Sequence, residues 1–169
     1  DMLMFDAGRL AGLAGDPRSN WARRSLVHAD QVVIVASARP DADESERIRR
    51  LLEIAPSRIP RWLALLHPAH TRRATGGRLL RERFGVDEVH HLHDRSDADL
   101  GRLARLAAGR GVGLVLSGGG ARGHAHLGVH RAITEQGIPI DRVVGASMGA
   151  IVAGMIAQGK SPGQTLDDM

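Results

Sequence analysis

Two strand–turn–helix units follow one another between residues 112 and 149, and their turns consist almost entirely of small residues. An apolar run, Val112 to Leu116, ends at the glycine-rich segment 117–123. A helix-like stretch follows, and the next apolar pair, at 143–144, ends at Gly-Ala-Ser-Met-Gly, positions 145–149. Because short connections join each strand to its helix, this stretch predicts an α/β fold with parallel strands.

Both turns have a composition with a chemical consequence. A glycine-rich turn ahead of a helix exposes backbone N–H groups at the positive helix end, which stabilises negative charge. The turn at 145–149 has the G-x-S-x-G form of a nucleophile elbow, in which the serine is strained and its neighbours must be small. One turn that holds an oxyanion and one that presents Ser147 as a nucleophile are the minimum for acyl transfer.

Each turn also has an interpretation without catalysis. The pattern Gly118-x-Gly120-x-x-Gly123 after a strand is typical of dinucleotide binding, and also of a tight turn without a ligand. Dinucleotide binding requires an acidic residue at the end of the next strand, whereas Asp141 precedes that strand. Taken alone, the pentapeptide at 145–149 is also typical of a turn of small residues where the start of a helix packs closely against its neighbours. The pairing favours catalysis, because turns after successive parallel strands lie at the same end of a sheet.

The composition excludes several classes of function. The chain has no cysteine, which excludes disulfides, thiolate zinc sites and cysteine nucleophiles. Its basic residues give a net charge of +4 but are scattered, and aromatic residues make up only 2%, so we expect no nucleic-acid partner. The longest nearly apolar stretch, 143–157, is glycine-rich and shorter than the about 20 residues of a spanning helix. No basic signal segment opens the chain.

The first part of the chain alternates strand-like and helix-like segments. A helix over 46–55, capped by Asp43 or Ser45, is expected after the buried strand Gln31–Ala36. The other expected strands are Met2–Phe5, Arg61–Leu66 and Val86–His93, and the other expected helices are Trp21–His28, Thr75–Phe84 and Asp97–Ala108. This alternation predicts a parallel, doubly wound sheet over 1–109 and a second domain over 110–169.

Histidines raise the question of a metal site. His126 and His130 are one helical turn apart, and His90, His91 and His93 cluster. No H-E-x-x-H pattern and no identifiable third ligand accompany them, so we expect no metal.

The stretch from Val112 to Ala157, with SGGGARGHAHLGV followed by GIPIDRVVGASMGAIVAGM, resembles the start of a patatin-like phospholipase domain. It is most similar to the bacterial relatives of neuropathy target esterase. The residues before Arg110 resemble, more loosely, the α/β segment that precedes the patatin domain in those proteins. The implied architecture is a Rossmann- or flavodoxin-like segment, 1–109, followed by the first third of a patatin-like α/β hydrolase domain, truncated at 169.

The resemblance implies a set of roles. Ser147 would be the nucleophile of a Ser–Asp dyad, so that a histidine such as His124, at a helix start, is not expected to be the base. The oxyanion loop would consist of Gly118, Gly119, Gly120, Arg122 and Gly123, and the elbow glycines would be Gly145 and Gly149.

The resemblance also implies substrates and surroundings. The substrates would be phospholipids, lysophospholipids or other carboxylic esters, cleaved without a cofactor. The expected location is the cytoplasm with peripheral contact to the membrane, and the parent chain would carry an upstream regulatory domain.

One departure from the family pattern concerns the dyad. The family's aspartate lies in an Asp-Gly-Gly or Asp-Gly-Ala motif beyond the elbow, and this chain has no Asp-Gly pair. Asp167 and Asp168 lack that glycine context. We therefore expect an active parent protein and an inactive fragment. The alternative is a non-catalytic nucleotide- or phosphate-binding or regulatory module that uses the turn at Gly118–Gly123.

Overall fold

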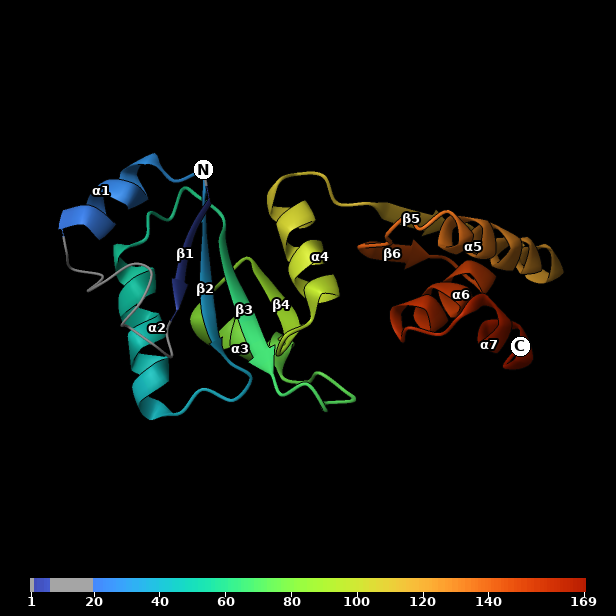
Figure 1. The fold of residues 1–169 in the computed structure, drawn as a ribbon, viewed down its shortest axis with the longest axis horizontal. Helices are drawn as coiled ribbons and strands as arrows, with labels where there is room; N and C mark the ends of the chain where they lie inside the picture. The colour runs from blue at the N-terminus through green and yellow to red at the C-terminus, as the bar shows by residue number, and fades with distance from the viewer. Residues whose placement is uncertain (1, 7–19) are drawn as a thin grey trace. The chain divides into compact units, whose positions relative to one another are not determined.

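The computed structural model describes residues 2–6 and 20–169 (Figure 1). The chain divides into two compact units, with the boundary between Leu103 and Ala104. This boundary falls inside the last helix before the Arg110-Gly111 segment.

The first unit contains a four-stranded parallel sheet in the order β1-β2-β3-β4. Register partners include Val33 with Trp62, and Ala64 with His90. The strands are β1 (Met2–Asp6), β2 (Gln31–Ser37), β3 (Arg61–His67) and β4 (Glu88–His93). This sheet confirms the predicted α/β class with parallel strands.

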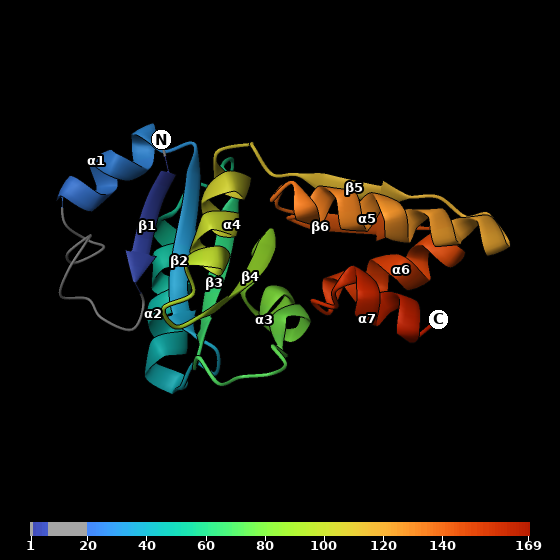
Figure 2. The ribbon, with the colours of Figure 1, turned by 45° about the vertical axis from the view of Figure 1, so that its right-hand side comes forward.

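Helices connect these strands and cover the sheet. They are α1 (Asn20–His28), α2 (Ala42–Ile54), α3 (Gly77–Phe84) and α4 (Asp97–Ala107). In Figure 2, α2 lies behind the sheet and α4 lies in front of it. Strands with a helix layer on each side must be apolar on both faces, which explains the uninterrupted β-branched run of β2.

The core of the first unit follows from this arrangement. Alternate strand residues such as Val32, Ile34 and Leu63 pack against helix residues, namely Leu26, Ile48, Leu51, Leu52, Leu80 and Phe84. The intervening residues, including Val33 and Ala64, are equally buried. Both faces of the sheet therefore exclude water.

Helix α2 corrects one prediction. Its N-cap is Asp41, in an extended conformation, and the Asp41 carboxylate accepts a 2.8 Å hydrogen bond from Glu44 N. The predicted caps are wrong, because Asp43 lies in the first turn and Ser45 is buried inside the helix. The helix starts earlier than predicted because Asp41 already satisfies a free N–H group of its first turn.

The second unit is built around a two-stranded parallel sheet, β5 (Gly113–Leu116) and β6 (Arg142–Gly145). A short 3-10 helix, η1 (Gly120–His124), leads into α5 (Ala125–Glu135). Helices α6 (Met148–Ala157) and α7 (Pro162–Asp167) follow β6.

One face of this small sheet is packed and the other is bare. Leu116 packs with Leu127, Val152 and Ala153 in a core between the sheet and the helices. On the opposite face, the register partners Val115 and Val144 are 78% and 63% exposed.

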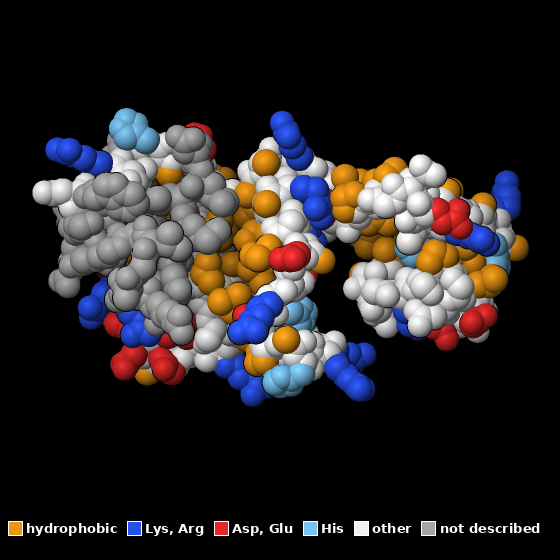
Figure 3. Space-filling view, in the orientation of Figure 1, with side chains coloured by type: hydrophobic (Ala, Val, Ile, Leu, Met, Phe, Trp, Pro, Cys, Tyr) orange, Lys and Arg blue, Asp and Glu red, His pale blue; other side chains and the backbone are white. Residues whose placement is uncertain are grey.

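Two further observations concern the surface and the helices. On the face drawn in Figure 3, Lys and Arg side chains are spread over the molecule and form no single basic patch. Among the residues that the structure describes, no helix combines the length and the apolar character needed to cross a bilayer.

Candidate active site

Ser147 occupies the sharp turn between β6 and α6. Its backbone has φ 51° and ψ −123°, a conformation that L-residues rarely adopt. Its side chain is exposed. Hydrogen bonds hold the turn on both sides, from Ala146 N to Leu116 O at 3.0 Å and from Ala150 N to Ser147 O at 2.9 Å. Strain of this kind persists only where surrounding contacts fix it, and it is concentrated at functional sites.

The two glycines that flank Ser147 allow this turn to form. A Cβ at Gly149 would lie 2.5 Å from the Ser117 carbonyl oxygen and 2.7 Å from the Leu116 carbonyl carbon. A Cβ at Gly145 would lie 2.6 Å from Ala150 N. Real Cβ atoms do not approach backbone so closely, so that strand and helix can pass each other only if both positions are glycine.

The glycine-rich turn after β5 lies directly beside the elbow. A Cβ at Gly118 would be 3.2 Å from the Ser147 Cβ and 3.9 Å from its Oγ. Gly123 is buried, and a Cβ there would be 2.7 Å from the Cβ of Met148, the residue after the serine. The structure therefore brings both ends of the predicted oxyanion loop against the predicted nucleophile turn.

The middle of the loop is more open. Gly120 has φ 55°, in the left-handed region, and a Cβ there would meet nothing within 4 Å. Gly119 would meet only the Cβ of Arg122, whose backbone N donates to Gly119 O at 3.2 Å. Gly119, Gly120 and Arg122 are exposed. A Cβ added at Gly119 or at Gly120 would therefore not meet Ser147.

His126 supports the glycine-rich turn, a role that the sequence did not predict. Its Nε2 donates a 2.8 Å hydrogen bond to the Ser117 carbonyl. His124, which is not expected to be the base, uses Nδ1 to donate a hydrogen bond to the Ala121 carbonyl at 2.8 Å. Both rings therefore fix the backbone around the turn. A histidine after a glycine-rich turn gives no sequence signal that separates such a role from a solvent-exposed one.

Two aspartates of this unit are engaged elsewhere. Asp141 is buried at the start of β6, where its carboxylate binds the Arg105 guanidinium and Val112 N. Asp168 pairs with Lys160. In the described part of the chain, no carboxylate forms a hydrogen bond to the Ser147 hydroxyl.

Several of the histidines considered as metal ligands have other partners. His90 is buried with its ring 4.5 Å from that of Trp62. The Nε2 of His67 and the Nδ1 of His91 share a 2.8 Å hydrogen bond. Over residues 2–6 and 20–169, no group of three or more His, Cys, Asp or Glu side chains is arranged to hold a metal ion.

Burial affects the charge of three histidines. It lowers the pKa of His130, and it is the main cause that lowers the pKa of His67 and of His91. Neighbouring positive charge adds to the effect at His67 and His91, from His93 among others. These rings are therefore neutral at neutral pH.

Comparison with known families gives two matches, which cover two successive parts of the chain. The model of the neuropathy target esterase family P-loop like domain matches residues 14–109, and the model of patatin-like phospholipase matches residues 114–169. The second match agrees with the prediction of a partial patatin-like domain.

The similar proteins carry related names. Patatin-like phospholipase domain-containing protein 6 of Mus musculus is 32% identical over 171 residues, which cover 86% of this chain and 12% of its own length. An uncharacterized NTE family protein of Mycobacterium tuberculosis is 34% identical over 151 residues, 86% of this chain and 22% of its own. Lysophospholipase NTE1 of Mycosarcoma maydis is 59% identical over 61 residues, 36% of this chain and 3% of its own.

The chain spans less than a quarter of the length of each of these relatives. No solved structure matches it significantly. The P-loop-like domain match alone extends over more than half of the chain, and the patatin-like match begins shortly after it, at residue 114. The chain therefore belongs to the neuropathy target esterase family.

Proposed function

We propose that the full-length protein is a serine ester hydrolase that cleaves carboxylic esters of phospholipids and lysophospholipids. The family is one of lipid esterases, and relatives of this chain are named as a lysophospholipase and as patatin-like phospholipase domain-containing proteins. The observation that supports the proposal best is the strained backbone of Ser147 directly beside the glycine-rich turn. A Cβ added at Gly118 would lie 3.2 Å from the Ser147 Cβ.

The proposed reaction proceeds in two steps. Ser147 Oγ attacks the ester carbonyl carbon, its proton passes to the dyad aspartate, and that proton then goes to the departing alkoxide. A water molecule attacks the resulting acyl-enzyme, gives its proton to the same aspartate, and Ser147 leaves with that proton as the fatty acid is released. No cofactor takes part.

We assign the stabilisation of the tetrahedral intermediates to the glycine-rich turn. The oxyanion forms beside Ser147, where backbone N–H groups of the segment containing Gly118, Gly119, Gly120, Arg122 and Gly123 can donate to it. Gly145 and Gly149 serve the reaction indirectly, because their lack of a side chain allows the elbow to form.

The dyad aspartate is expected from a part of the parent protein beyond the described residues. No described carboxylate bonds to Ser147, and we therefore propose that residues 1–169 alone are inactive. We place the domain limits at 1–109 and 110–169. We further propose a cytoplasmic protein that meets its lipid substrate at the membrane surface, carries an upstream regulatory domain and binds no nucleic acid.

A fluorophosphonate probe, which reacts covalently with activated serines, tests this function on the full-length protein. We expect stoichiometric labelling of the wild type and none of the Ser147→Ala variant. Ser161→Ala is the matched control, because Ser161 is also an exposed serine at a helix N-cap, and it should label normally. Absence of labelling together with tight nucleotide binding would instead support the binding-module alternative.

A further inference from the structure

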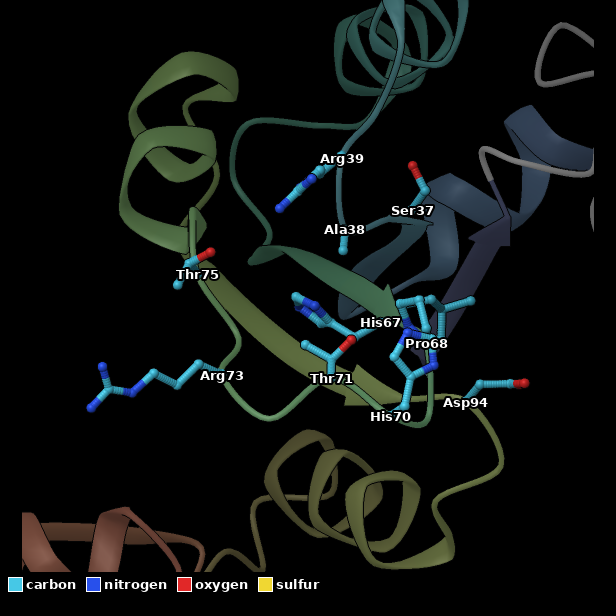
Figure 4. A pocket seen from close by; sticks show the side chains of 11 residues that line it. Ser37, Ala38, Arg39, His67, Pro68, His70, Thr71, Arg73, Thr75 and Asp94 are labelled. Atoms are coloured by element: carbon cyan, nitrogen blue, oxygen red, sulfur yellow. The ribbon is translucent and has the colours of Figure 1, made fainter.

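A cavity of about 620 Å³ opens at the carboxyl ends of β2 and β3 in the first unit (Figure 4). Residues 37–39, from the end of β2 and its connection to α2, form one wall. Residues 66–68, Asp94 and four residues of the connection 70–75 form the rest, namely His70, Thr71, Arg73 and Thr75. Ligands of open parallel α/β sheets bind at this edge, and the volume suits a molecule of nucleotide size.

The cavity carries unpaired positive charge. Arg39 and Arg73 line it, and among the described residues neither guanidinium has a carboxylate or hydrogen-bonding partner. By contrast, Arg49, Arg50 and Arg78 of the same unit pair with glutamates of their own helices, Arg78 with Glu82 at 3.0 Å. The one acidic residue of the lining, Asp94, is itself near a cation, Arg95 Nε, at 3.9 Å.

The start of α3 adds to this positive field. Thr75 lines the cavity directly before α3, whose N-cap Gly76 provides no side-chain hydrogen bond and whose first turn contains no acidic residue. The first N–H groups of this helix are therefore free to meet an anion. Helix α2, at the same edge, is different, because Asp41 caps it and its first turn contains Asp43 and Glu44.

The cavity wall is held in place by hydrogen bonds. Thr71 N donates to Pro68 O at 2.9 Å, and Thr71 O accepts from His93 Nε2 at 3.1 Å. The other ring nitrogen of His93 lies 2.8 Å from the Asp99 carboxylate. The buried His67 ring is fixed by its bond to His91. The connection 70–75 is thus anchored to β4 and α4.

Polar and apolar groups are separated within the lining. Ala38, Leu66 and Pro68 provide an apolar wall, with Leu66 41% exposed at the end of β3. Figure 4 shows Arg39 extending over the cavity, with Thr71 and Thr75 facing it from the opposite connection. Arg73 extends from the rim away from the other labelled groups, so it must rotate to reach a ligand.

We propose that this cavity binds the phosphate or diphosphate group of a small ligand, whether a nucleotide or a lipid headgroup. Arg39 pairs with the phosphate oxygens, Arg73 closes over them, and the start of α3 with Thr75 donates further hydrogen bonds. The organic part of the ligand rests on Ala38, Leu66 and Pro68. This site lies in the first unit and is separate from the proposed hydrolase chemistry at Ser147.

Isothermal titration calorimetry of the full-length protein tests the proposal with four probes: ADP, pyrophosphate, glycerol 3-phosphate and the uncharged adenosine. We expect one site that binds at least one phosphorylated probe and does not bind adenosine measurably. Tighter binding of ADP than of glycerol 3-phosphate assigns the phosphate to a nucleotide, and the reverse order assigns it to a lipid headgroup. No binding of any phosphorylated probe by the wild type would overturn the proposal.

Two exposed neighbours give a matched pair of variants. Arg73→Gln removes a guanidinium that lines the cavity, and Arg72→Gln removes one that does not. We expect Arg39→Gln and Arg73→Gln each to weaken binding about 10-fold or more, as expected for the loss of a charge-assisted pair, and Arg72→Gln to leave it unchanged. Equal weakening by all three variants would show that the ligand is attracted by the general positive charge of the surface, and it would overturn the proposed site.

Thr75→Val provides a further variant without a change of charge. It removes one hydroxyl from the wall and keeps the shape of the side chain. Binding about threefold to tenfold weaker, with an unchanged unfolding temperature, supports the assigned position of the phosphate. Binding equal to that of the wild type excludes the Thr75 hydroxyl from the site and overturns this part of the proposal.

Discussion

The guanidinium of Arg105, in the last turn of α4, binds both carboxylate oxygens of the buried Asp141. The distances are 3.0 Å from Nε to Oδ2 and 2.6 Å from Nη2 to Oδ1. Asp141 also accepts a 2.9 Å hydrogen bond from Val112 N, and its own backbone N donates to Val112 O. One carboxylate therefore fixes the beginnings of β5 and β6, and thereby the strands whose ends carry the two glycine turns.

Asp141→Asn should destabilise the second unit. The substitution weakens charge-assisted bonds of a buried group, and we expect a loss of about 1–3 kcal/mol in the free energy of unfolding. Urea denaturation measures this loss. The control is Asp168→Asn, since the partly exposed pair with Lys160 should be worth about 0–1 kcal/mol. Similar losses for both variants would contradict the role given to Asp141.

Gly118→Ala should impair the reaction more than the fold. Gly118 has no positive φ, so alanine fits its backbone, but the new methyl group would lie 3.2 Å from the Ser147 Cβ. A displacement of a few tenths of an ångström at the nucleophile should slow ester hydrolysis by roughly 10-fold or more. Gly128→Ala, in α5 with open space around it, should leave the rate unchanged. Steady-state kinetics of the full-length protein would show the difference.

Alanine substitutions at two glycines of α6 should change the free energy of unfolding in opposite directions. Gly149→Ala forces a methyl group against the carbonyls of residues 116 and 117, and overpacking of this kind costs about 1–3 kcal/mol. Gly154→Ala meets nothing within 4 Å and should stabilise the helix by roughly 0.5–1 kcal/mol. Thermal unfolding of the two variants measures both changes in stability. Changes of the same sign in the two variants would contradict the crowding at Gly149.

Stability should fall as the pH is lowered through about 6.5. Burial lowers the pKa of His67, His91 and His130 in the folded chain, while their unfolded values stay near 6.5. Below that pH the unfolded chain binds more protons than the folded one, so that its free energy falls relative to the folded state. The three histidines contribute their full stabilisation above their pKa in the unfolded chain. This contribution declines as the pH falls toward their pKa in the folded chain.

His130→Leu separates one contribution to this pH dependence. The side chain of His130 is buried in α5, and its Nδ1 has no hydrogen-bond partner in the described part of the chain. Denaturation midpoints measured from about pH 8 to about pH 5 should fall less steeply in this variant than in the wild type. An unchanged slope would show that His130 binds its proton equally well in both states.

Local patterns predicted most of the secondary structure and the contact between the two turns. The run at Gln31–Ala36 predicted β2 because a strand buried on both faces has only apolar positions. The start of α2 was missed because Asp41, Asp43 and Ser45 are all good capping residues, and only the backbone conformation of Asp41 decides among them.

The phosphate-binding cavity could not be predicted in the same way. Arg39 and Arg73 are far apart in the sequence, and a pattern of single arginines says nothing about which strands are neighbours. They line the same cavity only because β2 and β3 are adjacent and parallel, which places the connections after both strands at one edge. The hydrogen bond from His126 to Ser117 likewise depends on how α5 leaves the turn.

The strand order of the first unit has a consequence for how the protein is made. Each strand pairs with the one that directly precedes it in the chain, so that closing each pair requires only one helix and its connections. Such moderate loops keep the entropic cost of every pairing step small and similar. The order in which the ribosome releases the strands is thus the order in which they can pair, and the sheet can grow while the glycine-rich turns of the second unit are still being synthesised.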